Sequence, residues 1–368
     1  MRAWTFGLGV DDLTIARWRL RAQGLAGDEF GSILEAVEVL TGVQAENYSQ
    51  ATWAVSTRTA GSTRDGFRRL FDEGEILRTH VLRPTWHFVR PADIRWLLET
   101  TAPRVLRSFQ QLQRALDLDD RELARSHDII GELLSNSTLS REALGAGMRV
   151  QGVITEGQRL GLMLMNAELR GLICSGPTQG GDQTYALLEE RAPRARRLDR
   201  DEALAELAHR YFSGHGPATE RDLSYWASLT LTDVRKGITG AGDRLDSFEH
   251  DGRTFLFGGE SPPPTTAPSS RAHLLQMLDE YHNGYQDSRY VLDVAGIVPR
   301  GRRSNVGMVL VDSQMVGGMR RTVGPSSVRF DIDLFREITS EDRAAVETAA
   351  SRYASFLELV PEAVFSPA

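Results

Sequence analysis

One arrangement recurs three times along the chain and constrains its fold more than any other feature. Runs with apolar residues at helical spacing are followed by two short strand-like runs, which is the order of elements in a winged helix. In the first copy the spacing predicts helices over residues 11–22, 31–40, 49–57 and 63–71 and strands over 76–82 and 86–89. Repetition at about the size of one winged helix predicts tandem units rather than a short-period solenoid.

The second and third copies follow the same order. The second is predicted to contain helices over 92–116 and 140–169 and strands over 171–176 and 183–188. In the third, helices are expected over 199–212, 219–227 and 230–238, with strands over 244–248 and 254–257. Residues 217–234 are typical of a helix-turn-helix.

The last part of the chain has a different texture. A run rich in Pro, Ser and Thr, Pro262–Ser270, is typical of a linker. Short β runs at 291–292, 306–311, 315–319 and 328–332 and a helix over 340–359 predict a small barrel or curled sheet. We therefore predict an α+β fold with winged-helix domains over 1–90, 91–198 and 199–260 and a C-terminal β-barrel-like domain over 271–368.

A short polar joint, Thr41–Tyr48, connects two predicted helices of the first copy. Gln44 and Glu46 lie two residues apart, so in an extended joint their side chains point to the same side. The amide could hold a water and the carboxylate could take its proton, which is the pairing that hydrolysis needs. The alternative is a plain helix connection in which Glu46 caps the next helix, and spacing alone does not separate the two.

The charge balance argues against a uniformly basic nucleic-acid binder, because the chain has 43 Lys and Arg against 50 Asp and Glu and a formal net charge of -7. All but one of the basic residues are Arg, whose planar fork suits phosphates and guanine edges. Codon bias in a GC-rich genome explains the same imbalance. Lys236 is the one lysine, and hence the one candidate for Schiff-base chemistry.

Two local clusters are predicted to contact DNA. The hairpin of the first copy carries donors and an aromatic ring at Arg78, His80, Arg83, Thr85, Trp86 and His87. A second cluster, between β runs of the last domain, contains Arg300, Arg302 and Arg303. The alternatives are that Trp86 is a core residue and that the arginines keep exposed loops in solution.

Other classes of site find little support. The single cysteine, Cys174, excludes a disulfide within the chain and an all-cysteine metal site, and is expected to be a small buried residue at a strand end. No dinucleotide or phosphate-loop glycine motif is present, and the histidines are not at metal-ligand spacing, so we expect no metal and no cofactor. The N-terminus lacks a secretion signal and no run of eighteen apolar residues occurs, so we expect a cytoplasmic protein without a membrane partner.

Four segments resemble the winged-helix DNA-binding family that includes the AlkZ-like DNA glycosylases. They are Thr41–Glu46, Leu82–Val89, Gly171–Pro177 and Asp279–Tyr285, and the similarity extends from about residue 10 to about residue 360. The resemblance implies three tandem winged helices and a C-terminal β-barrel that form a C-shaped clamp on DNA. It also implies removal of alkylated purines, especially bulky N7-alkylguanine adducts and cross-links, including self-resistance in producers of DNA-alkylating antibiotics.

The catalytic motif of that family is Gln-apolar-Gln or, in a second branch, Gln-apolar-Asp. Gln44-Ala45-Glu46 falls on it, with Glu in place of the second residue. The resemblance implies that Gln44 orients a water and that Glu46 accepts its proton and faces the developing positive charge of the sugar. The expected enzyme is a monofunctional glycosylase that acts as a monomer on double-stranded DNA containing an alkylated purine.

Two other functions fit a DNA-binding repeat protein. A winged-helix transcriptional regulator would bind one operator and release no base from damaged DNA. A non-catalytic DNA-binding protein could sequester a DNA-bound natural product, and turnover under excess substrate would distinguish it from the enzyme.

Overall fold

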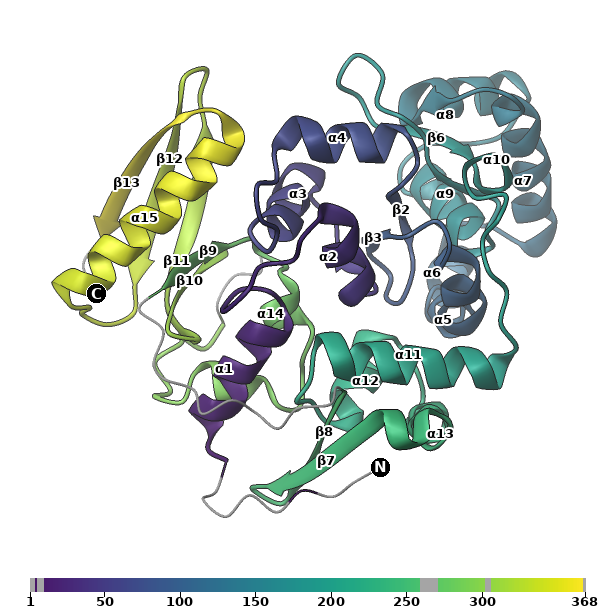
Figure 1. The fold of residues 1–368 in the computed structure, drawn as a ribbon. Coiled ribbons are helices and arrows are strands. Elements are labelled where there is room, and N and C mark those ends of the chain that lie inside the picture. The colour runs from purple at the N-terminus through teal and green to yellow at the C-terminus, as the bar shows by residue number, and fades with distance from the viewer. Residues whose placement is uncertain (1–3, 5–9, 259–270, 302–305, 367–368) are drawn as a thin grey trace.

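The computed structural model describes residues 4, 10–258, 271–301 and 306–366 (Figure 1). Helices and antiparallel sheets alternate along the chain, so the predicted α+β class is confirmed. The predicted linker, Pro262–Ser270, lies outside the described residues. Among the helices that the structure describes, none has the length and apolar character needed to cross a bilayer.

The first repeat carries the predicted polar joint. Its elements are α1 (Asp12–Ala22), α2 (Ile33–Val39), β1 (Val43–Gln44), α3 (Tyr48–Ser56), α4 (Arg64–Asp72), β2 (Leu77–His80) and β3 (Trp86–Val89). The three strands form an antiparallel sheet in the order β1-β3-β2. The joint is therefore an edge strand, and the predicted hairpin supplies its neighbour in the sheet.

The start of α3 differs from the prediction. The helix begins at Tyr48 rather than at residue 49, and Asn47 caps it, since the Asn47 side chain accepts a hydrogen bond from the Gln50 backbone N–H at 3.1 Å. Asn is among the best N-cap residues when its own backbone is extended, as it is here. The alternative in which Glu46 caps this helix is therefore wrong, and its carboxylate is left for another role.

The second and third repeats also place two helices before a hairpin, but they differ from the first in the elements that precede these helices. The second contains α5 (Ile94–Ser108), α6 (Gln110–Ala115), α7 (Asp120–Leu134), β4 (Leu139–Ser140), α8 (Arg141–Val150), α9 (Arg159–Leu169), β5 (Ile173–Ser175), β6 (Thr184–Leu187) and α10 (Leu188–Arg191). Its sheet order, β4-β6-β5, matches that of the first repeat. The third contains α11 (Arg200–Gly214), α12 (Glu220–Trp226), α13 (Leu231–Ala241), η1 (Gly242–Arg244), β7 (Leu245–His250) and β8 (Arg253–Gly258). An isolated bridge between Ala218 and Leu256 takes the place of its first strand.

The C-terminal part is an open sheet in the described residues. It contains β9 (Ala272–Leu275), α14 (Glu280–Asn283), η2 (Arg289–Leu292), β10 (Gly307–Val311), β11 (Gln314–Val323), β12 (Ser327–Leu334), α15 (Ser340–Leu357) and β13 (Val360–Ser366). The strand order β13-β12-β11-β10-β9 leaves β9 and β13 as edges, so the predicted barrel is not found there and the curled sheet is the better description. The predicted strand at 291–292 is a 3-10 helix, and β9 and β13 were not predicted.

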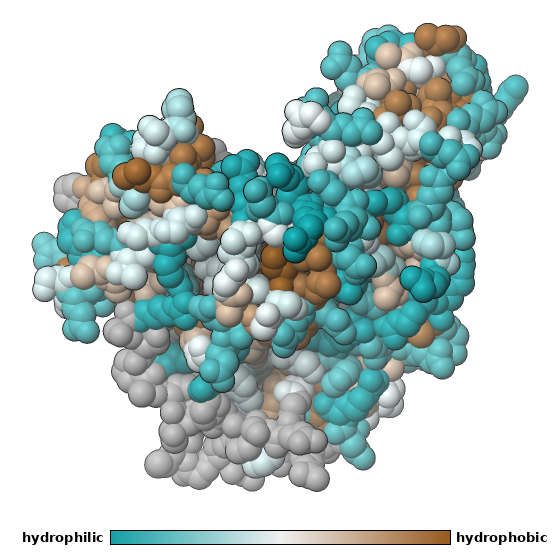
Figure 2. Space-filling model, turned by 45° about the horizontal axis from the view of Figure 1, so that its top comes forward, coloured by the Kyte–Doolittle hydropathy of each residue, from teal (hydrophilic) through white to brown (hydrophobic). Residues whose placement is uncertain are grey.

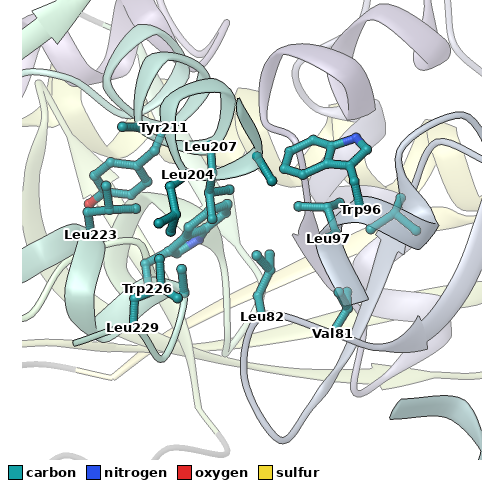
Figure 3. Packing of buried hydrophobic residues seen from close by; sticks show 14 of the residues in the cluster. Val81, Leu82, Trp96, Leu97, Leu204, Leu207, Tyr211, Leu223, Trp226 and Leu229 are labelled. Atoms are coloured by element: carbon teal, nitrogen blue, oxygen red, sulfur yellow. The ribbon is translucent and has the colours of Figure 1, made fainter. Parts of the chain in front are cut away.

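A large core fixes the loop between β2 and β3. Val81 and Leu82 belong to the same buried cluster as Trp96 of α5 and Trp226 of α12, and Leu82 lies between the residues of these two helices (Figure 3). Leu82 adopts φ 65, a left-handed conformation that side chains disfavour and that tight packing must hold. Because Leu82 is anchored in this way, the position of its neighbour Arg83 is also fixed.

Candidate active site

Gln44 is the last residue of β1 and pairs with His87 of β3. Its side chain is enclosed, with 5% of the residue's surface exposed. The side-chain oxygen Oε1 accepts hydrogen bonds from Arg83 Nη2 at 3.1 Å and from Asn283 Nδ2 at 3.2 Å. A buried amide needs such partners, and here they come from the β2–β3 loop and from α14.

The backbone of Gln44 is held by the C-terminal part of the chain. Its N–H donates to Glu280 Oε1 at 2.8 Å, and its carbonyl accepts from Gln276 Nε2 at 3.4 Å. Both partners lie more than 230 residues away in sequence, in the segment that leads into α14 and in α14 itself. The C-terminal part of the chain therefore completes the edge of the first repeat's sheet.

Glu280 is the buried charge at the centre of this network. Its Oε2 accepts from Trp226 Nε1 at 2.8 Å and lies 3.4 Å from His215 Nε2, while its Oε1 lies 3.6 Å from Arg83 Nη2. Burial alone would raise the pKa of Glu280, but the contact with His215 and the charge of Arg83 outweigh it and bring its pKa to about 2. Glu280 is therefore ionised at neutral pH and joins the first repeat, the third repeat and α14.

Glu46 lies on the surface, two residues beyond Gln44. Its Oε2 accepts a hydrogen bond from the Trp86 backbone N–H at 3.4 Å, and no ion pair to its carboxylate is found among the described residues. An exposed carboxylate with one weak partner remains free to accept a proton or to face a cation. The prediction that it shares one pocket with the Gln44 side chain stays a prediction.

Arg78 and Trp86 brace the joint. Arg78 donates from Nε to the Ala45 carbonyl at 2.9 Å and from Nη2 to the Glu46 carbonyl at 3.3 Å, and its guanidinium lies 4.4 Å from the Trp86 ring centre. Trp86 in turn donates from Nε1 to Glu168 Oε1 at 3.0 Å. Arg78 therefore uses two of its donors on the protein itself, and both residues are only half-buried.

Three of the residues predicted to contact DNA are enclosed by the protein. His80, Arg83 and His87 have exposed fractions of 7%, 7% and 0%, because the hairpin folds back onto the core and is covered by α9 and α14. His80 Nδ1 lies 2.5 Å from Glu168 Oε2. The contacts of these three residues are internal, so their burial gives no support to the prediction that they contact DNA.

His87 is a neutral buried histidine. Its Nδ1–H donates to the Thr85 carbonyl at 2.9 Å, which leaves Nε2 to accept from Arg83 Nη2 at 3.4 Å. Burial, together with the charge of Arg83, lowers the pKa of His87 to about 3. His87 is therefore uncharged at neutral pH.

The remaining predicted residues are partly accessible or not described. Thr85 is half-buried, and Arg300 is exposed in the turn that precedes β10. Arg302 and Arg303 lie outside the described residues. The space-filling view in Figure 2 shows a hollow between the C-terminal sheet and the second repeat, with strongly hydrophilic side chains gathered in it.

In the described residues, Cys174 and the potential metal ligands form no further candidate site. In the described part of the chain no group of three or more His, Cys, Asp or Glu is placed to hold a metal ion. Cys174 is buried in β5, as predicted, and burial raises the pKa of its thiol to about 12. A thiol in that state is not a nucleophile at neutral pH.

Sequence reasoning missed three residues of this site: Glu168, Glu280 and Asn283. Glu280 and Asn283 fall in a segment that carries the family resemblance, but nothing local gave them a role. Their partners in β1 and the β2–β3 loop are about 200 residues away or more, so no spacing in the sequence could connect them. Glu168 follows an apolar helical run and carried no signal except a charge on a buried face.

Comparisons with known proteins agree with this architecture. An interstrand DNA cross-link repair glycosylase of Streptomyces sahachiroi is 26% identical over 276 residues, covering 72% of this chain and 74% of that protein. The solved structure of the DNA glycosylase AlkZ from the same organism has the same fold, with a TM-score of 0.79 and 22% identity over 96% of this chain and 99% of that one. The family described as DNA glycosylase AlkZ-like matches residues 37–356, which include the joint, the hairpin and α14. This chain therefore belongs to the AlkZ-like DNA glycosylase family.

Proposed function

We propose that this protein hydrolyses the N-glycosidic bond of alkylated purines in double-stranded DNA, with Glu46 and Gln44 as its catalytic residues. The observation that carries the proposal is the contrast between these neighbours. Gln44 is held by four hydrogen bonds from three parts of the chain, whereas the carboxylate of Glu46 is exposed and unpaired by any described cation. A fixed amide next to an available carboxylate fits a site that positions water and takes its proton.

The chemistry follows from the charge of the damaged base. Alkylation at N7 makes guanine cationic, so the bond from C1′ to N9 breaks with its electron pair passing to the base, which leaves neutral. The sugar becomes oxocarbenium-like, and the Glu46 carboxylate would stabilise that positive charge. Water then forms the new bond at C1′ and gives its proton to Glu46, and the product is an abasic site.

No covalent intermediate with an amine is expected. Lys236, the one lysine of the chain, lies in α13 of the third repeat, and its Nζ is 2.6 Å from Asp201 Oδ1. A lyase step would need an amine at C1′. We therefore propose a monofunctional hydrolase that leaves the DNA strand intact.

The repeated order of elements supports a DNA clamp. We propose that the repeats are three winged helices, with domain limits near 1–90, 91–198 and 199–260, and that the C-terminal domain over 271–368 closes the clamp. Arg78, Thr85 and Trp86 at the hairpin, and the loop that contains Arg300, Arg302 and Arg303, would contact the phosphates. A clamp built within one chain needs no second subunit, so we propose a monomer that acts on DNA in the cytoplasm.

The proposed lesions are bulky N7-alkylguanine adducts and cross-links. The name of the Streptomyces sahachiroi relative supports this class, because that protein is called an interstrand DNA cross-link repair glycosylase. An open clamp suits an adduct that is too large for a closed base pocket. Such an activity would protect a producer of a DNA-alkylating antibiotic.

A glycosylase assay on a defined duplex tests the proposal. The protein is mixed with duplex DNA that contains one N7-methylguanine, and abasic sites are revealed by alkali, with unmodified duplex as control. We expect multiple turnovers, free N7-methylguanine and no strand break before the alkali step. Tight binding without base release would support a regulator or a sequestering protein and would refute the enzyme.

A further inference from the structure

The orientation of the Gln44 amide is set by its neighbours. Arg83 has only N–H donors, so only the oxygen of Gln44 can face its Nη2 at 3.1 Å. The same oxygen requires Asn283 to present its nitrogen, which lies 3.2 Å away. Asn283 Oδ1 then accepts from His282 Nδ1 at 3.0 Å, so each polar atom in this chain of contacts has a complementary partner.

The other end of the amide is available. Gln44 Nε2 has no hydrogen-bond partner among the residues that the structure describes, and it is not one of the fully enclosed unpartnered atoms. The small exposed fraction of Gln44, 5%, therefore includes a group with two N–H donors. Its carbonyl oxygen, with two donors already bound, cannot serve as an acceptor for a ligand without breaking this network.

We infer that Arg83 and Asn283 fix Gln44 as a hydrogen-bond donor to the attacking water, and that Asn283 is a positioning residue for hydrolysis. The inference rests on the proposed glycosylase activity. It separates the roles of the two catalytic residues: Gln44 donates to the water oxygen, and Glu46 accepts the water proton. A water held by one donor and one acceptor keeps its remaining lone pair for C1′.

The reversed amide would not give this geometry. With its oxygen outward, Gln44 would compete with Glu46 for the protons of the water and would leave the water oxygen without a fixed donor. The Gln44 amide oxygen and the Glu46 carboxylate would then both accept from the water, and neither would donate to the water oxygen. The buried partners of Gln44 therefore fix the direction in which its N–H groups donate a hydrogen bond.

Asn283→Asp and Asn283→Ala separate this role from simple packing. The carboxylate of Asp cannot donate to the Gln44 oxygen, and it can draw Arg83 into an ion pair, so the Gln44 amide loses both of the donors that fix its orientation. We expect kcat on N7-methylguanine duplex to fall about 100-fold in Asn283→Asp, with KM unchanged, because an oriented donor is lost. Asn283→Ala keeps the Arg83 contact, so we expect a fall of only about tenfold.

Gln286→Glu is the matched control for the added charge. Gln286 is exposed on the same segment, three residues after Asn283, and we expect its kcat and KM to stay within about twofold of wild type. A structural role for Asn283 predicts the opposite order, with the cavity in Asn283→Ala more harmful than the isosteric Asp. That order, or an unchanged kcat in Asn283→Asp, would overturn the inference.

Gln44→Glu provides a second test that does not touch Asn283. The new carboxylate keeps the length of the side chain and can pair with Arg83, but it cannot donate to water. We expect Gln44→Glu to lose as much kcat as Gln44→Ala, whereas activity within about threefold of wild type would refute obligate donation. If the wild-type protein releases no base, the proposed function itself fails. If the wild type is active and the Asn283→Asp and Gln44→Glu variants are equally active, only this inference fails.

Discussion

Replacing Glu280 by Gln should show how strongly the buried charge holds the site together. Gln has the shape of a protonated glutamate and can still accept from the Gln44 N–H. It removes the charge that faces Arg83 and leaves that buried guanidinium without its nearest carboxylate, 3.6 Å away in the wild type. Loss of one partner of a buried pair is costly because the other charge stays enclosed.

The pKa of Glu280 gives the size of the effect. Its ordinary value of 4.5 falls to about 2 in the folded protein. At about 1.4 kcal/mol per pKa unit, a difference of about 2.5 corresponds to about 3 kcal/mol of folding free energy. Because the folded pKa is the lower one, this contribution is complete well above pH 4.5 and is lost as the pH falls toward 2. About 1.4 kcal/mol of it is already lost at pH 3.5.

Urea unfolding followed by tryptophan fluorescence measures this directly. We expect Glu280→Gln to lower the free energy of unfolding by about 3 kcal/mol at pH 7 and by about 2 kcal/mol at pH 3.5. Glu347→Gln is the matched control, since Glu347 is exposed on α15, and it should change stability by less than about 0.5 kcal/mol. A difference below about 1 kcal/mol at pH 7, or one that does not shrink in acid, would refute the charge network as described.

Two further predictions concern the joint and its neighbours. Arg78→Ala removes the donors to the Ala45 and Glu46 carbonyls, so kcat on N7-methylguanine duplex should fall about tenfold and the free energy of unfolding by about 1 to 2 kcal/mol. Arg104→Ala, at an exposed arginine, is the control. An unchanged kcat in Arg78→Ala would contradict the role of Arg78 in holding the joint. The pKa of His87 is about 3 when folded against an ordinary 6.5, so the unfolded chain takes up a proton first and stability falls below pH 6.5. His87→Gln should reduce the loss of unfolding free energy between pH 7 and pH 4.5 by about 2 to 3 kcal/mol, and equal losses in both proteins would exclude a neutral buried His87.

Much of the local structure follows from local signals. The helices α4, α11 and α12 begin directly after good N-cap residues, Thr63, Asp199 and Thr219, whose side chains accept hydrogen bonds from the first turn. The strand over Trp86–Val89 was predicted to the residue. Such signals depend on a few neighbouring residues, so the elements that they predict do not depend on contacts with distant parts of the chain.

The incorrect predictions concern elements and residues whose structure depends on contacts between distant segments of the chain. β13 pairs in parallel with β12, and β9 pairs with β10 across more than 30 residues, so neither strand is evident from its own sequence. Arg83 and His87 looked like an exposed basic cluster, yet α14 covers them with Glu280 and Asn283. The proposed catalytic pair was predicted from its spacing and from the family resemblance, while the residues that contact Gln44 became evident only from the fold.

The proton acceptor is the central claim, and Glu46→Ala, which leaves neither the carboxylate nor the amide of the family motif, tests it most directly. Base release from N7-methylguanine duplex is followed in a single turnover with enzyme in excess, and DNA affinity is measured on the same duplex. Since Glu46 is exposed, the variant should fold and bind DNA as the wild type does, while the rate of base release should fall by about 100-fold or more. A rate within about threefold of wild type at equal affinity would contradict the assignment of Glu46 as the group that takes the proton of water.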